Sequence, residues 1–136
     1  IIPPGEGFLA QPRNSAVNIV HVGEVRNHVL VLALSAGTQM MGSTSTAPRT
    51  PVAMGFSITN GWVGSSSAIN ADRLRLWLGD DSPGATGYEN YQLTPTDVWV
   101  LEADPNFNSQ NGSDLFIPWK STFLVLQSAR LITVNP

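Results

Sequence analysis

The stretch from Ala71 to Gly79 constrains the fold more than any other part of the chain, because its apolar residues recur at every second position. Three leucines fall on one face of an extended chain, and two arginines with a tryptophan fall on the other: Leu74, Leu76 and Leu78 against Arg73, Arg75 and Trp77. A period of two is typical of a half-buried β-strand, whereas a helix would spread the leucines round its circumference. The pattern therefore predicts a central strand here.

Shorter segments of similar character flank this strand, separated by Gly, Pro, Ser and Asn. We expect further strands over residues 16–22, 28–35, 52–59, 96–103, 115–119, 122–127 and 130–134, with loops over 35–51, 79–91 and 104–114. The segment 28–35 is apolar on both faces and is expected to lie deep in the fold, and Asn60-Gly61 favours a type I′ hairpin. About eight short strands without an amphipathic helix predict an all-β protein, an antiparallel β-sandwich or a jelly-roll-like fold.

The first thirteen residues differ from the rest. They hold three prolines and two glycines, which exclude a helix and predict an extended N-terminal arm. The whole chain has 136 residues, which is the usual size of one domain, so residues 14–136 are expected to form a single β-sandwich domain. The apolar residues of the arm, Ile1, Ile2, Phe8 and Leu9, are the ones expected to contact a neighbouring subunit. The alternative is a chain terminus without a binding role.

The composition disfavours several classes of function. Only 12% of the residues are charged, the net charge is −3, and Lys120 is the sole lysine, so no basic patch for nucleic acid is expected. The absence of cysteine excludes a disulfide scaffold and a thiolate nucleophile or metal site. No apolar run reaches the roughly 18 to 20 residues of a membrane-spanning helix, so no membrane association is expected.

No catalytic signature is visible. The only histidines, His21 and His28, could meet across a hairpin and bind a metal with Glu24, but we interpret them instead as polar residues that flank a turn. No nucleophile has an identifiable base beside it, and the carboxylates lie mostly in loops. We therefore expect a protein that is not an enzyme and uses no cofactor.

One polar loop resembles the first half of a calcium-binding loop. Oxygen-bearing side chains recur there at Asp104, Asn106, Asn108 and Asp114. The sixth position is Ser109 instead of Gly and the twelfth is Leu115 instead of Glu, so the calcium pattern is incomplete. A weak calcium site and a loop satisfied by its own Asx turns are both compatible with these residues.

Aromatic residues are the remaining candidates for binding. Trp77 lies opposite the leucine face, on the same side as Arg73 and Arg75, and Tyr88 and Tyr91 lie at the end of the most exposed loop that the sequence predicts. Three roles fit Trp77: packing within the fold, contact with a protein partner, or stacking on a sugar.

The style of the whole chain resembles that of a virion structural protein: no cysteine, few charges, a Pro-rich leading segment and Ser/Thr/Gly/Ala-rich loops. It resembles tailed-bacteriophage components such as capsid decoration (cement) proteins or fibre domains. The resemblance implies location in the virion, self-association, often as a symmetric trimer, binding to coat protein subunits, and no enzyme activity. The alternative class is a carbohydrate-binding or adhesin β-sandwich module, such as a receptor-binding fibre domain.

Overall fold

The computed structural model of the chain describes residues 29–42, 45–77, 87–118 and 120–134. Within these ranges the fold is all-β, as predicted. Its seven strands are β1 (Leu30–Leu34), β2 (Gly37–Gly42), β3 (Arg73–Trp77), β4 (Tyr88–Leu93), β5 (Trp99–Leu101), β6 (Ser121–Leu126) and β7 (Arg130–Val134). The helical elements of these residues are two single 3₁₀ turns, Ile58–Asn60 and Ala68–Asn70, and none could cross a membrane.

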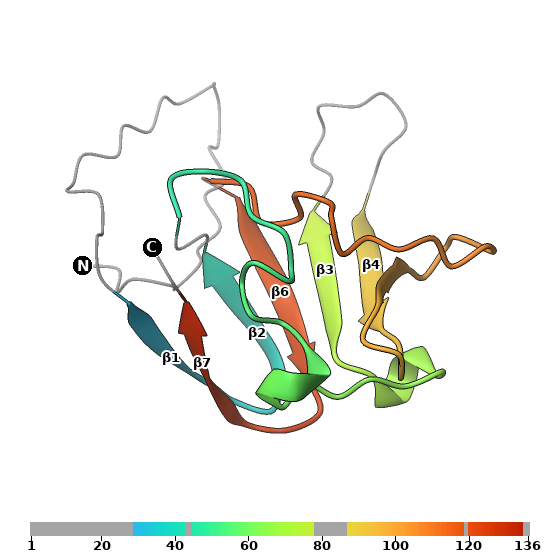
Figure 1. Cartoon of the computed structure of the whole chain (residues 1–136), viewed down its shortest axis with the longest axis horizontal. Coiled ribbons are helices and arrows are strands. Elements are labelled where there is room, and N and C mark those ends of the chain that lie inside the picture. The colour runs from blue at the N-terminus through green and yellow to red at the C-terminus, as the bar shows by residue number, and fades with distance from the viewer. Residues whose placement is uncertain (1–28, 43–44, 78–86, 119, 135–136) are drawn as a thin grey trace, which may run out of the picture.

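Five strands form the main sheet in the order β2-β6-β3-β4-β5, with every neighbouring pair antiparallel (Figure 1). The strand β3 lies in the middle, which confirms the prediction made from its alternating leucines. Leu74 is fully buried on the inner face of the sheet, while Trp77 is exposed on the outer face. Alternation in the sequence thus fixes which side of the sheet meets the core.

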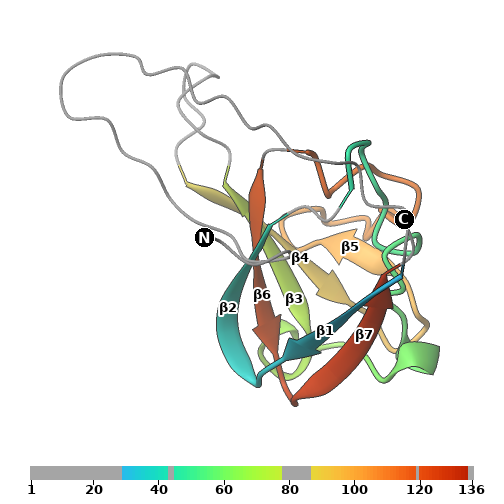
Figure 2. The ribbon, with the colours of Figure 1, turned by 90° about the vertical axis from the view of Figure 1, so that its left-hand side faces the viewer.

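The other two strands, β1 and β7, form a separate antiparallel sheet, an arrangement consistent with a β-sandwich (Figure 2). Only residues 35–36 separate β1 from β2, and only residues 127–129 separate β6 from β7. Leu34 pairs with Arg130 on one side of this corner, and Gly37 pairs with Leu126 on the other. Two paired strands therefore leave one sheet and enter the other together. Gly37 has a φ of 93°, which strongly favours glycine at the corner.

A buried ion pair lies at this corner. The carboxylate of Asp72, just before β3, is fully buried and lies 2.7 Å from Nη1 of Arg130, at the start of β7. The backbone N–H groups of Val63 and Gln127 each donate to this carboxylate at 2.7 Å. A buried charge is tolerated when it is paired and its lone pairs are filled in this way. Asp72 therefore connects β3, the corner and the segment that covers the core.

Arg130 has further partners besides the carboxylate. Its Nη1 donates to the carbonyl oxygen of Gly61 at 2.8 Å, and its guanidinium carbon lies 4.8 Å from the ring centroid of Trp62. Gln127 adds hydrogen bonds from its side-chain amide to the carbonyl oxygens of Ile69 and Ala71. The corner is thus held mainly by polar contacts, while the core beside it is apolar.

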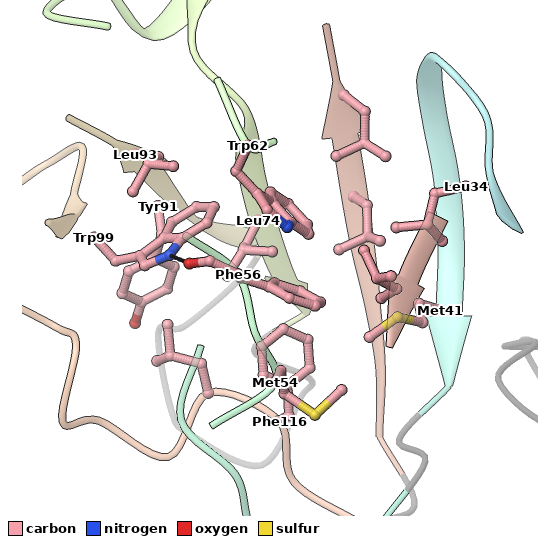
Figure 3. Packing of buried hydrophobic residues seen from close by; sticks show 14 of the residues in the cluster. Leu34, Met41, Met54, Phe56, Trp62, Leu74, Tyr91, Leu93, Trp99 and Phe116 are labelled. Carbon is pink, nitrogen blue, oxygen red and sulfur yellow. Dashed lines mark hydrogen bonds between the residues drawn. The ribbon is translucent and has the colours of Figure 1, made fainter. Parts of the chain in front are cut away.

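The core lies between the inner face of the main sheet and the segments that cross it (Figure 3). The rings of Phe56 and Trp62 stack with centroids 4.0 Å apart, and Phe116 meets Phe56 edge-on at 4.9 Å. Trp99 of β5 donates from Nε1 to the carbonyl oxygen of Phe56 at 2.8 Å, so this buried indole N–H is satisfied. Irregular segments thus supply much of the layer that faces the five-stranded sheet.

The predicted strand over 52–59 is wrong. This segment forms local turns, in which Met54 donates its N–H to the carbonyl of Thr50 and Phe56 donates to Pro51. Met54 and Phe56 are nevertheless both buried. The Asn60-Gly61 hairpin is wrong as well: Gly61 has the expected positive φ, 85°, but it ends a 3₁₀ turn.

Two strands were expected to be loops. β2 lies within the stretch 35–51, and β4 begins at Tyr88, within the stretch 79–91. Backbone pairing with β6 and β3, respectively, overrides their weak local preference. The strand expected over 115–119 is reduced, in its described part, to a single bridge between Phe116 and Arg49.

The segment 28–35 does contain a strand, β1, but the deep burial predicted for it is wrong, since Val31 is exposed. A two-stranded sheet buries only its inner face here. The strands predicted over 96–103, 122–127 and 130–134 correspond to β5, β6 and β7. The strand expected over 16–22 and the arm 1–13 lie outside the described residues, so the boundary between arm and domain stays a prediction.

Candidate functional site

A pair of exposed aromatic rings lies on the outer face of the main sheet, where β3 ends and β4 begins. Trp77 and Tyr88 are directly opposite each other in the antiparallel register. Their ring centroids are 4.9 Å apart at an interplanar angle of 63°, and their exposed fractions are 45% and 37%. Cross-strand aromatic pairs of this kind stabilise a sheet, but their remaining exposed area is available to a partner.

Two further side chains complete the group, which we call the aromatic cluster: Trp77, Tyr88, Phe123 and Arg75. Phe123 of β6 meets the ring of Tyr88 edge-on at 5.6 Å. The guanidinium carbon of Arg75 lies 5.0 Å from the Tyr88 ring centroid, within range of a cation–π interaction. Its Nε donates to Oδ1 of Asn90 at 2.9 Å, which fixes its orientation. The cluster thus combines apolar rings with one oriented cation on a rigid sheet.

The position of Trp77 and Arg75 opposite the leucine face was predicted from the alternation in β3, while the exposure of Trp77 was left open. The sequence analysis missed Phe123 and did not place Tyr88 beside Trp77, because both neighbours come from other strands. The alternation in β6, where Thr122, Leu124 and Leu126 are buried, could have indicated that Phe123 points outward.

Tyr91 does not belong to the cluster, although it was predicted together with Tyr88. It lies on the inner face of β4, is nearly fully buried, and donates its hydroxyl to Oε2 of Glu89 at 2.7 Å. Burial, followed by the hydrogen bond and the negative charge of Glu89, raises the pKa of Tyr91 well above its usual value. Tyr91 therefore stays neutral at physiological pH, and its role is in the core.

The loop expected to bind calcium is organised by one of its own carboxylates. Asp104 accepts backbone N–H groups of Asn106 and Asn108 with its two oxygens, each at 2.9 Å. These hydrogen bonds, despite a smaller opposing effect of desolvation, hold the pKa of Asp104 below its usual value. These contacts are the ones expected for a loop whose polar groups are satisfied by its own Asx turns. Among the described residues, no group of three or more His, Asp or Glu side chains could hold a metal ion, and the side chain of Asp114 is exposed.

Phe107, in the same loop, is an exposed aromatic residue that the sequence analysis did not single out. Its side chain is 58% exposed and its φ is 49°, a left-handed conformation that is uncommon for a residue with a bulky side chain. The backbone on both sides of it is held by the N–H groups of Asn106 and Asn108, which donate to the carboxylate of Asp104. No described aromatic ring stacks on it, so it serves as a comparison for the rings of the cluster.

The other residues predicted to take part in binding lie outside the described residues. They are the arm residues Ile1, Ile2, Phe8 and Leu9, and the candidate metal ligands His21, Glu24 and His28. Their roles stay predictions.

Comparison with protein-family models, curated proteins and solved structures finds no match.

Proposed function

We propose that this chain is a non-enzymatic virion structural protein that self-associates and binds neighbouring coat subunits, with the aromatic cluster as its contact to the coat. The single observation that carries the proposal is the exposed pair of Trp77 and Tyr88 on the outer face of the main sheet, with the half-buried Arg75 beside it. Trp, Tyr and Arg are the residue types most enriched among the energetically dominant contacts of protein interfaces.

The geometry of the cluster suits a protein partner. Its side chains are already held by one another and by Asn90, so little rotamer freedom remains to be lost when a partner covers them. Removing water from the rings would strengthen the interaction between Arg75 and Tyr88. A partner with an apolar surface beside a carboxylate or a carbonyl group would complement this face.

The virion setting rests on the resemblance in composition. A chain with only 12% charged residues has little electrostatic repulsion between copies, which favours dense assembly. In this setting the arm 1–13 would contact a neighbouring copy, while the aromatic cluster would contact the coat. The protein would act through its shape and its surfaces.

A carbohydrate-binding or adhesin module is the second candidate. It is favoured by an aromatic ring, Trp77, next to polar groups that could hydrogen-bond a sugar, those of Arg75 and Asn90. Because the ring planes of Trp77 and Tyr88 are inclined at 63°, they do not form a flat platform. This shape suits a protrusion of a protein better than the flat face of a sugar ring.

Binding to coat shells of the parent phage, assembled without this chain, tests the proposal. The Trp77→Ser variant is expected to bind at least about tenfold more weakly than the wild type, since truncating a dominant interface residue costs more than about 1.4 kcal/mol. The matched control is Phe107→Ser, which removes a more exposed aromatic ring outside the cluster and should bind as the wild type does.

Unchanged binding of Trp77→Ser, or equal losses in the two variants, would contradict the proposed coat contact. A glycan array provides the second arm. If the wild type binds glycans and Trp77→Ser does not, while neither binds shells, the adhesin function replaces the structural one.

A further inference from the structure

The two-stranded sheet has an outer face that is aliphatic and exposed. Val31 and Leu131 have exposed fractions of 58% and 69%. They alternate with the inward-facing residues of β1 and β7, and each is paired across the strands with another exposed residue, Thr133 and Ala33, respectively. We call these four side chains the aliphatic face.

This face carries no charge. The only ionisable side chain in either strand is that of Arg130, and its guanidinium is turned inward to Asp72. The inner face of the same sheet, which includes Leu34, Ile132 and Val134, is buried in the core. Strands that are aliphatic on both sides are expected where both sides are covered. The exposed side therefore indicates an occupant outside the folded domain.

The size of the aliphatic face limits what the occupant can be. A standard interface between two globular proteins takes roughly 20 to 30 residues from each partner, whereas this face offers four side chains on two short strands. A narrow, extended and apolar segment fits it better than a second globular surface. The small side chain of Ala33, opposite Leu131, leaves room for a larger side chain of the occupant.

We propose that the occupant is the arm 1–13 of a second copy of this chain. The arm supplies apolar side chains, Ile1, Ile2, Phe8 and Leu9, and its prolines lower the entropy lost when it docks. Proline has no N–H group, so the Pro3-Pro4 end of the arm is poorly suited to extend a sheet and suited to pack on its face.

Length and symmetry favour exchange between copies. Residues 14–28 connect the arm to β1, and an extended segment of this length spans up to about 50 Å, enough to reach a neighbour. When each copy gives its arm to the next and the rotation closes, every aliphatic face is filled by one repeated contact. The inference rests on the proposed self-association and names the surface that provides it.

Cysteine cross-linking tests the contact directly, because the chain has no cysteine of its own. Full-length Phe8→Cys is mixed with a tagged full-length Ala33→Cys variant and treated with a short bismaleimide. We expect a cross-linked product that contains both chains. The matched control is Ala103→Cys, an exposed alanine after β5, at the far edge of the main sheet. This control should give at least about tenfold less product than Ala33→Cys, because a docked arm raises the effective concentration of the Phe8→Cys thiol only near the aliphatic face.

Analytical ultracentrifugation gives an independent measurement. Leu131→Asp is expected to shift the oligomer to a monomer that keeps the β-sheet circular dichroism spectrum of the wild type, and Phe8→Asp should have the same effect from the other side of the contact. The matched control is Ile69→Asp, which places the same charge at an equally exposed aliphatic residue on a 3₁₀ turn and should leave the oligomer intact.

The outcomes separate this inference from the proposed coat contact. An oligomer that survives Leu131→Asp, equal cross-linking in the control mixture, or a monomeric wild type overturns the arm exchange. So does cross-linking that occurs only within a Phe8→Cys/Ala33→Cys double variant, since the occupant would then be the chain's own arm. Shell binding lost in Trp77→Ser but kept in Leu131→Asp would leave the coat contact standing by itself.

Discussion

The outer faces of the two sheets differ in chemistry. On the five-stranded sheet, Trp77 and Tyr88 pair edge-on and the guanidinium of Arg75 lies over the Tyr88 ring, whereas the two-stranded sheet exposes only uncharged side chains such as Val31 and Leu131. Contacts between aromatic rings and a cation are directional, and salt screens their electrostatic part. Aliphatic contacts have no preferred direction and involve no charge that salt could screen. The domain thus presents two outer surfaces of different chemistry, to which the proposals above assign different partners.

The buried pair of Asp72 and Arg130 joins the start of β3 in the main sheet to β7 in the two-stranded sheet, so removing it should weaken the connection between the two sheets. Asp72→Asn leaves the guanidinium buried without its counter-charge, and we expect a loss of about 3–5 kcal/mol of unfolding free energy. Chemical denaturation measures this loss. The control is Glu102→Gln, which removes the partly exposed ion pair with Arg73 at 3.8 Å and should cost less than about 1 kcal/mol. Similar losses in the two variants would contradict the role given to Asp72.

Tyr91 tests whether the inner side of the main sheet is independent of its outer cluster. Tyr91→Phe removes the hydrogen bond to Glu89 and should cost about 0.5–1.5 kcal/mol, with binding to coat shells unchanged. Because folding raises the pKa of Tyr91, its contribution is complete below about pH 10 and is lost as the pH rises further.

Stability measured between neutral pH and about pH 11 should therefore fall less in Tyr91→Phe than in the wild type. The Tyr88→Phe variant, in which Tyr91 is the only tyrosine, isolates the phenol in an ultraviolet titration. Ionisation of Tyr91 near its usual pKa while the protein is still folded would contradict the interpretation.

The smallest expected effect comes from replacing Arg75, the cation that distinguishes the outer face of the main sheet from the aliphatic face. Arg75→Lys keeps the charge but removes the planar group beside Tyr88 and the fixed Nε contact to Asn90. We expect about 0.5–1 kcal/mol lower stability, with weaker shell binding and an unchanged oligomer. A double-mutant cycle with Tyr88→Leu measures the coupling. Additive effects of the two substitutions would show that the ring and the cation act separately.

Local alternation predicted the fold class and the strands in which it is regular. β3 was predicted because leucines occupy one face without interruption. β2 was not, because its glycines and polar residues bury mainly Met41 and its pairing with β6 is set by distant residues. In 52–59 the spacing of Met54 and Phe56 resembles that of a strand, although local turns bury both side chains.

The candidate site was predictable only where it depends on one strand. The outward direction of Trp77 follows from its own neighbours in the sequence. Its partners depend on register: Tyr88 is opposite it on β4, and Phe123 comes from β6. Pairing between strands far apart in the sequence leaves no local pattern in either strand, so these contacts could not be read from spacing. The buried pair of Asp72 and Arg130 escaped prediction for the same reason.

The pairing of β1 with β7 also determines how the chain can fold. Leu30 pairs with Val134, roughly a hundred residues further along the chain, and β2 likewise pairs with the distant strand β6. Neither sheet can close during synthesis until the last of these strands has left the ribosome. Until then β1 and β2 have no partner strand, and slow folding through non-local pairing leaves such strands open to aggregation. The corner that joins the two sheets therefore forms late in folding. Conditions that slow the synthesis of β6 and β7 would lower the yield of folded protein.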